Sequence, residues 1–274
     1  MGFKTGSSHI LRRPRVAGYL YPSDPAQLRQ TIARLMGEPM GTAVARVVMV
    51  PHSSYDFSGA IAGATLSPLQ IPARWIIIGT NHTGVGPSWS LMADGAYQTP
   101  LGDVPVDNVL AEALLRQCPL LDADPSAHWG EHAIEVELPW LQERRPADVR
   151  IVPMITRSED PAACRQVAGA IAEVMRSSAQ PLALLISSDL SHDEPREVII
   201  EKDAGLLEAI QALDADQFTS RARARSARLC GSGAIACGLW VARFLGARQG
   251  RVVRYGTSAE AGGDPDSAIG FAGA

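Results

Sequence analysis

The chain has 274 residues, 46% of them hydrophobic and 20% charged, with a formal net charge of −4. This balance is ordinary for a globular protein and gives no electrostatic reason to expect nucleic acid or an anionic membrane surface as a partner. No apolar stretch approaches the roughly 20 residues of a membrane-spanning helix, and the first residues lack the apolar core of a secretory leader, so we expect neither.

Apolar runs of strand length alternate with segments of helix length along the chain. We predict strands at 46–50, 74–79, 88–92, 150–155, 182–187, 251–255 and 268–272. We predict helices at 26–36, 58–66, 109–118, 131–142, 161–176, 195–213 and 231–245, and a loop at 95–107. Continuous apolar strands suit a parallel sheet that is covered on both faces. Since no linker or internal repeat interrupts the alternation, we expect one α/β domain over residues 1–274, with a central mixed, largely parallel sheet flanked by helices.

Four of the six histidines lie at the ends of these predicted elements. His52, His82 and His192 each follow a predicted strand, and His132 lies where a helix is expected to begin. Side chains at the carboxyl ends of parallel strands converge on one crevice. We therefore expect a polar pocket that suits a transition metal or proton transfer.

Each of these positions also has a plainer interpretation. Taken alone, His52 and His82 are better explained as histidines hydrogen-bonded to nearby backbone, although Asn81 could orient a ligand or substrate group. Asp189 shares a turn with His192. Its carboxylate either faces the imidazole and sets its tautomer or caps the next element, and the sequence leaves both open.

His128 and His132 are four residues apart, the spacing of two ligands on one helix face. Trp129-Gly130 argues against a helix across both, and the glutamate position does not fit an HExxH zinc site. We place His132 in the pocket rather than His128. Glu135 and Glu137 are expected to be structural or solvent-facing.

The four cysteines are scattered and form no CxxC pair, so we expect reduced thiols in a cytoplasmic protein. Cys230 precedes Gly231-Ser232-Gly233 and a predicted helix. Its sulfur would lie at a helix N-terminus, where the thiolate is favoured. The alternative is a buried small apolar side chain, which is the interpretation that suits Cys237.

Five motifs carry most of these residues. They are Pro51-His52-Ser53-Ser54-Tyr55, Gly79-Thr80-Asn81-His82-Thr83-Gly84, Glu131-His132-Ala133-Ile134-Glu135, Ser187-Ser188-Asp189-Leu190-Ser191-His192 and Cys230-Gly231. Together they resemble the MEMO family, whose prokaryotic members are also called AmmeMemoRadiSam system protein B. The likeness runs in order over nearly the whole chain. One departure is Ser53-Ser54, where the family usually has Ala-Gly, and this difference bears on substrate shape.

The resemblance implies a fold like that of the class III extradiol dioxygenases, whose non-haem iron is held by two histidines and a glutamate. By position, the family's metal ligands are His52, His82 and Cys230 here. His192 and Asp189 match further pocket residues. His132 matches the family's histidine on the intermediate helix.

From these residues we expect a mononuclear divalent metal, iron(II) first, with copper or zinc as alternatives. In an enzyme acting on a small aromatic or polar substrate, His192 backed by Asp189 would be the general acid/base. His132 would contact the substrate as a third catalytic residue, and Asn81 and Tyr55 are the substrate-binding candidates. A thiolate in place of the carboxylate argues against a simple transfer of dioxygenase activity.

Two other functions compete with this one. The first is a non-catalytic accessory protein that holds a metal or a peptide. The family name then implies a radical-SAM enzyme as partner, which would supply its own cluster because this chain has no cysteine triad. The second is a nucleophile at Cys230 activated by His192 or His132. It ranks last, because the neighbouring histidines are better explained as co-ligands.

Overall fold

The computed structural model describes residues 10–38, 41–145, 148–224 and 229–274. A central sheet has the strand order β2-β8-β3-β7-β4. In that order the strands are β2 (Val47–Val50), β8 (Leu182–Ser187), β3 (Arg74–Thr80), β7 (Arg150–Thr156) and β4 (Trp89–Leu91). The first four are parallel, and β4 pairs with β7 in the antiparallel direction. This arrangement confirms the predicted α/β fold with a mixed, largely parallel sheet.

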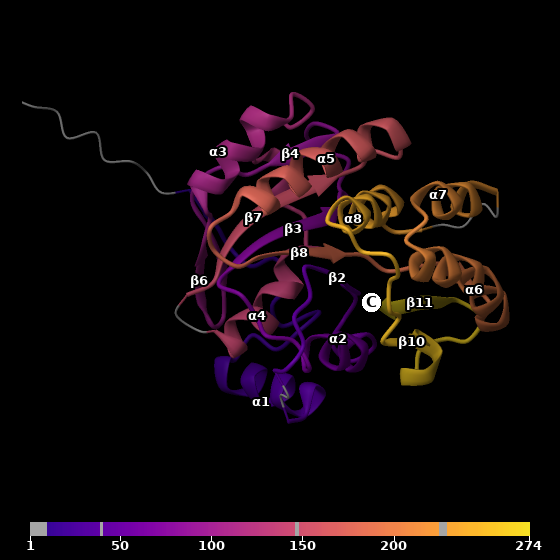
Figure 1. The fold of residues 1–274 in the computed structure, drawn as a ribbon. Coiled ribbons are helices and arrows are strands. Elements are labelled where there is room, and N and C mark those ends of the chain that lie inside the picture. The colour runs from indigo at the N-terminus through magenta and orange to yellow at the C-terminus, as the bar shows by residue number, and fades with distance from the viewer. Residues whose placement is uncertain (1–9, 39–40, 146–147, 225–228) are drawn as a thin grey trace, which may run out of the picture.

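The alternation of side chains along the strands explains why both faces of the sheet are covered. On β3, Trp75 and Ile77 belong to one buried cluster, whereas Ile76 and Ile78 belong to another. The first cluster packs under α1 (Pro25–Met36), α2 (Gly59–Leu66) and α4 (Leu138–Arg144). The second packs under α3 (Asn108–Gln117), α5 (Pro161–Ser177) and α8 (Ser232–Phe244). Figure 1 shows the two groups of helices on opposite sides of the sheet.

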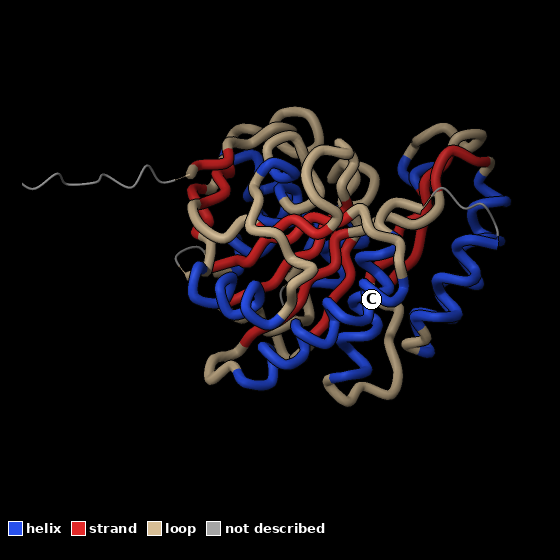
Figure 2. The backbone as a smooth tube through the Cα atoms, turned by 90° about the horizontal axis from the view of Figure 1, so that it is seen from above, coloured by secondary structure: helices blue, strands red, loops and turns tan. Residues whose placement is uncertain are grey.

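Two small sheets flank the central one. The first has the order β10-β11-β9, formed by β10 (Arg254–Thr257), β11 (Ala268–Gly273) and β9 (His192–Glu194). In Figure 1 it lies beside α6 (Arg196–Ala212), and α7 (Ala215–Ala224) packs between α6 and α8. The second has the order β1-β5-β6, formed by β1 (Leu11–Arg12), β5 (Ala96–Thr99) and β6 (Gly102–Pro105). Figure 2 shows, from above, the central strands between helices and loops, with further strands at the edges of the molecule.

The structure differs from the predicted elements in several places. Residues 95–107, expected to be a loop, contain the β5–β6 hairpin. Its strands were not predicted because the buried positions, Tyr97 and Thr99, alternate over too few residues to give a clear pattern. The helix expected at 131–142 begins only at Leu138, after the short turns η1 (Ser126–His128) and η2 (Glu135–Glu137). The Glu131 carboxylate bonds the next two backbone N–H groups, which holds this segment in a turn.

Smaller differences lie at the C-terminal end. β10 begins at Arg254 rather than at 251, and it is followed by the short turn η3 (Ser258–Ala261). α7 was not predicted as a separate helix, and residues 225–228 after it are not described. Among the described residues, none of the helices is both long and apolar enough to cross a membrane.

The strand order places the site. Because β8 lies between β2 and β3 and all three are parallel, their carboxyl ends meet at one edge of the sheet. The segments that follow these strands carry His52, Asp189 and His82. This is the crevice position at which open α/β sheets bind ligands.

Candidate metal centre

His52 is held at the edge of the sheet by contacts from the neighbouring strand. It follows β2 and Pro51, and its side chain is 2% exposed. Its backbone N–H donates to Asp189 Oδ1 at 2.9 Å, and its ring Nδ1 lies 3.1 Å from Ser187 Oγ. These contacts leave Nε2 as the ring atom that points toward Cys230.

His82 is held in the same way by a carboxylate. Its backbone N–H donates to Glu131 Oε2 at 2.6 Å, and its Nδ1 lies 2.8 Å from Glu131 Oε1. Burial raises the pKa of Glu131, but the hydrogen bond from His82 and the positive charges of His82 and His132 outweigh it and lower this pKa to about 2. Glu131 is therefore ionised at neutral pH and orients the ring of His82, so that Nε2 faces Cys230.

Cys230 supplies the sulfur on which both rings converge. Its Sγ lies 3.1 Å from His52 Nε2 and 2.6 Å from His82 Nε2. Burial raises the pKa of Cys230, but the positive charge of His52 and the hydrogen bonds of both histidines lower it below its usual value. Burial in turn lowers the pKa of each histidine, and the thiolate charge raises it above its usual value. The three groups therefore form a thiolate–imidazolium cluster, in which His52 and Cys230 are buried and His82 is exposed.

Local backbone geometry brings Cys230 to this point. It precedes α8, as predicted, and Gly231 between them has a φ of +84°. A Cβ at Gly231 would overlap Thr80 Oγ1 and Ser188 Oγ. The Ser188 hydroxyl donates to the Cys230 carbonyl. Only glycine allows the backbone to pass this close to the ends of β3 and β8.

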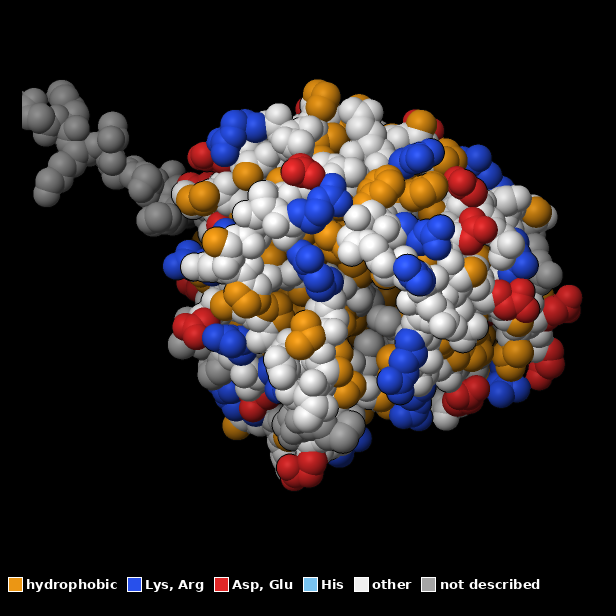
Figure 3. All heavy atoms as spheres, in the orientation of Figure 1, with side chains coloured by type: hydrophobic (Ala, Val, Ile, Leu, Met, Phe, Trp, Pro, Cys, Tyr) orange, Lys and Arg blue, Asp and Glu red, His pale blue; other side chains and the backbone are white. Residues whose placement is uncertain are grey.

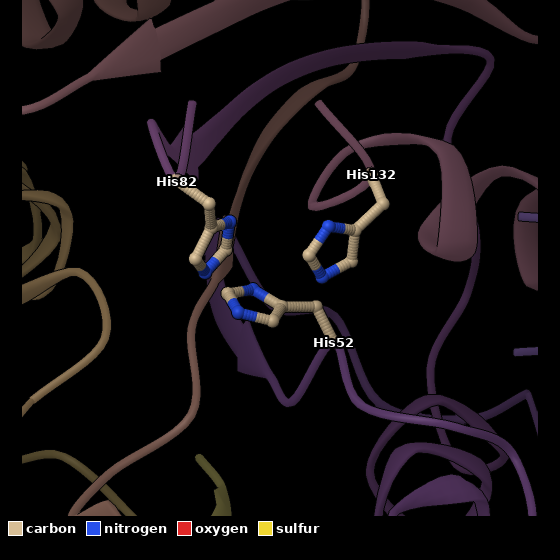
Figure 4. A group of neighbouring side chains, drawn as sticks. All are labelled: His52, His82 and His132. Carbon is tan, nitrogen blue, oxygen red and sulfur yellow. The ribbon is translucent and has the colours of Figure 1, made fainter. Parts of the chain in front are cut away.

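His132 completes a group of three imidazoles (Figure 4). One ring nitrogen from each of His52, His82 and His132 lies within 4.8 Å of the others. The His132 ring stacks on His82 with centroids 4.6 Å apart. Burial and the neighbouring charge of His52 lower the pKa of His132 to about 4, so its ring is neutral at pH 7. It lies in the turn before η2 and not at the start of a helix, which corrects the expectation from sequence.

Asp189 lies between two imidazoles. Its Oδ2 is 3.9 Å from His52 Nε2 and 3.8 Å from His192 Nε2. The Nδ1 of His192 lies 2.8 Å from the Leu190 carbonyl. Because a carbonyl only accepts, Nδ1 carries a proton, and Nε2 is the atom that faces Asp189. The sequence left two roles open for Asp189, facing the imidazole of His192 or capping the next element. In the structure its carboxylate faces the imidazoles of His192 and His52.

The turn that carries Asp189 and His192 is braced by a buried carboxyl group from α6. Asp203 is fully buried, and its Oδ1 accepts from the Ser191 backbone N–H at 3.2 Å and the Ser191 hydroxyl at 2.6 Å. Its Oδ2 accepts from the Tyr255 hydroxyl at 2.9 Å. Burial raises the pKa of Asp203.

Asn81 and Tyr55, the substrate-binding candidates, use their polar atoms within the protein. The Asn81 side chain donates to the Val85 carbonyl and accepts from Gly84 N–H and the Thr83 hydroxyl, so it shapes the loop after β3. The Tyr55 hydroxyl is bonded to the Val136 carbonyl at 2.7 Å and its ring packs in the core. The polar atoms of both side chains therefore stabilise the protein around the site.

Glu131, Ser187 and Arg12 are important in the structure but were not singled out in the sequence. Arg12 is fully buried, bonds the Glu131 and His128 carbonyls and pairs with Glu135. This network ties β1 to the turn that carries Glu131 and His132. A Glu-His dipeptide after a glycine was the available signal for Glu131. Nothing in the local sequence marks Arg12 or Ser187, because their partners lie far along the chain.

The other residues of this turn have structural positions. His128 is fully buried, its Nδ1 lies 2.7 Å from the Tyr97 hydroxyl, and burial lowers its pKa to about 4. As expected, His132 and not His128 belongs to the imidazole group. Glu135 and Glu137 are both fully buried, so of the two alternatives for them only the structural one applies.

The donor set fits a transition-metal ion. His52 and His82 both hold Nδ1 against a protein group and turn Nε2 toward the Cys230 sulfur. Metal-binding histidines commonly have such a partner on the second ring nitrogen. Imidazole and thiolate donors suit iron(II), copper or zinc, and not magnesium or calcium.

None of the described histidines is visible on the face drawn in Figure 3, where charged and apolar side chains are interspersed.

Comparison with known proteins shows the family of this chain. Residues 12–274 match the family described as Memo-like protein. The MEMO1 family protein of Methanopyrus kandleri is 34% identical over 274 residues, covering 95% of this chain and 97% of the relative. That of Methanothermobacter thermautotrophicus is 34% identical, covering 96% and 99%, and that of Aquifex aeolicus is 31% identical, covering 96% and 98%. The chain therefore belongs to the MEMO family.

Proposed function

We propose that this protein binds one divalent transition-metal ion through His52, His82 and Cys230 and uses it to act on a small substrate. The observation that carries the proposal is the shared orientation of the two histidines, whose Nε2 atoms lie 3.1 and 2.6 Å from one sulfur. Each Nδ1 is occupied by a protein group behind it. If the protons between each Nε2 and the sulfur are lost, two nitrogen lone pairs and a thiolate become available at the same place to bind one metal ion.

Iron(II) is the metal we propose, with copper and zinc as the alternatives that the same donors accept. When bound, the metal supplies Lewis acidity or redox chemistry to a substrate at the rim of the site. We propose that the protein is an oxidoreductase and that its substrate is a small aromatic or polar molecule. The likeness to extradiol dioxygenases motivates oxygen as co-substrate, and the thiolate ligand distinguishes this site from theirs.

The remaining side chains of the site have roles that follow from their protonation. His192 directs Nε2 toward Asp189 and is our general acid/base, with Asp189 as the carboxylate that faces it. His132 is neutral at pH 7, stacks beside His82 and is 26% exposed, so it can exchange a hydrogen bond with a substrate. Asp189 also contacts the His52 backbone, which couples the base to the metal ligands.

Metal analysis of protein purified without added metal tests the proposal. We expect wild type to carry close to one equivalent of transition metal, and His52→Ala and Cys230→Ser to carry almost none. Cys237→Ala is the matched control, because Cys237 lies on α8, is fully buried and belongs to the apolar core. Equal metal content in wild type and both ligand variants would refute the site. Oxygen uptake by the iron-loaded protein across a panel of catechols then tests the proposed chemistry.

A further inference from the structure

Behind His52, away from Cys230, lies a row of buried polar groups, of which the proposed function uses only the contact between Ser187 and His52. His52 Nδ1 is 3.1 Å from Ser187 Oγ, and Ser187 Oγ is 3.1 Å from Glu137 Oε1. The same hydroxyl contacts the Ala133 carbonyl, which is the shortest of its three hydrogen bonds. Glu137 and Ser187 are both fully buried, and Glu137 Oε2 has no partner among the described residues.

Counting protons fixes the direction of each bond. A serine hydroxyl has one proton to donate and two lone pairs with which to accept. The Ala133 carbonyl has no proton, so Ser187 donates there. The other two neighbours must then donate to Ser187. His52 does so through Nδ1–H, and Glu137 can do so only as a carboxylic acid.

We propose that Glu137 is a neutral carboxylic acid that acts through Ser187 to hold His52 with a proton on Nδ1 and Nε2 turned toward Cys230. Glu137 is thus a positioning residue and does not touch the site itself. The order of protons does not depend on the proposed function, whereas its effect on metal affinity rests on that function. The row joins η2 and the turn before it to the end of β8 and to the residues that follow β2.

The surroundings of Glu137 favour the neutral form. A carboxylate here would be fully buried with one oxygen, Oε2, lacking a hydrogen-bond partner among the described residues, which is costly. Burial raises the pKa of Glu137 to about 8, more than the charge of His52 and the Ser187 bond lower it, and Asp189 adds to the increase. The titratable groups that face Glu137 are His52 at the end of β2, Asp189 at the end of β8 and Tyr55 before α2. Above about pH 8, the ionised group would draw the Ser187 proton away from the Ala133 carbonyl.

Infrared spectroscopy of the metal-free protein tests the protonation directly. At about pH 6.5, we expect the difference spectrum of wild type minus Glu137→Gln to contain the C=O stretch of a carboxylic acid. This band should be lost on titration with a midpoint near 8. Asp203→Asn is the matched control, because Asp203 is equally buried but contacts Ser191 and Tyr255. The band assigned to Glu137, with its midpoint near 8, should remain in this variant. A difference spectrum that contains only carboxylate bands at the lower pH would overturn the proposal.

Nitrogen NMR of His52 tests the positioning role. We expect the His52 Nδ1–H signal of wild type to shift with a midpoint near 8 and that of Glu137→Gln to stay constant, since glutamine still donates to Ser187 but does not ionise. Ser187→Ala should lose the slowly exchanging signal and weaken zinc binding roughly 10-fold. A titration in Glu137→Gln that matches wild type, or a His52 without a proton on Nδ1, would contradict the inference. Failure of every variant and of wild type to bind zinc would instead count against the proposed function.

Discussion

The Nε2 atom of His82 lies 2.6 Å from the sulfur of Cys230, although 148 positions separate the two residues in the chain. The contact joins the loop after β3 to the segment before α8, and no local sequence signal connects these two parts of the chain. His52 makes the same kind of contact from the end of β2. The site therefore depends on the order of strands in the sheet.

The affinity for metal should depend on pH well above the usual pKa of histidine. The pKa of His52 is raised from 6.5 to about 10 and that of His82 from 6.5 to about 9. Burial lowers both values, but the thiolate of Cys230 stabilises both protonated rings and outweighs this effect. Metal must displace these protons. Zinc affinity should therefore keep rising between about pH 6.5 and about pH 8.5, as measured by competition titration. Affinity that is constant above about pH 6.5 would contradict this.

Replacing Glu131 by glutamine should weaken zinc binding roughly 10- to 100-fold, the usual effect of removing the partner of a metal-binding histidine. The substitution removes the charge that holds the Nδ1 proton of His82 and loosens two backbone bonds in the turn. Glu143→Gln is the control, because Glu143 pairs with Arg29 on the surface. If both variants bind zinc as wild type does, Glu131 does not orient His82.

Gly231→Ala should destabilise the protein and reduce its metal content together. A positive φ costs alanine about 1–2 kcal/mol, and the new Cβ also overlaps Thr80 and Ser188. Gly262→Ala is matched, since its φ is +92° but nothing lies within 4 Å of its Cβ. Urea unfolding should show a larger loss for Gly231→Ala, and only this variant should lose metal. Equal losses would mean that the close approach at Gly231 is unimportant.

Arg12→Ala should lower the free energy of unfolding by about 3–5 kcal/mol, because it leaves Glu135 buried without its charged partner. The double variant Arg12→Met with Glu135→Leu removes both charges and should recover part of this loss, as urea unfolding would measure. Since Arg12 also bonds the Glu131 carbonyl, zinc affinity should fall in Arg12→Ala. A fall in stability with unchanged zinc affinity would mean that the contacts of Arg12 stabilise the fold but do not position the metal ligands.

Much of the fold was predictable because it depends on local patterns. The continuous apolar runs at 74–79 and 182–187 indicate buried parallel strands, and these are β3 and β8. Polar residues after such strands converge by topology, which is why His52 and His82 could be placed in one pocket. The β5–β6 hairpin was missed, because its four-residue strands are too short for a clear alternation.

The sequence by itself determined the α/β architecture, the family, and the histidines and cysteine that meet at the sheet edge, since these follow from periodicity and ordered motifs. Only the tertiary structure decided that Glu131 orients His82, that Ser187 and Glu137 stand behind His52, and that Asn81 and Tyr55 use their polar atoms internally. The reason is physical. A hydrogen bond, a buried charge and a shifted pKa depend on which distant segments come within about 3 Å of each other, and that is settled by packing and not by local sequence.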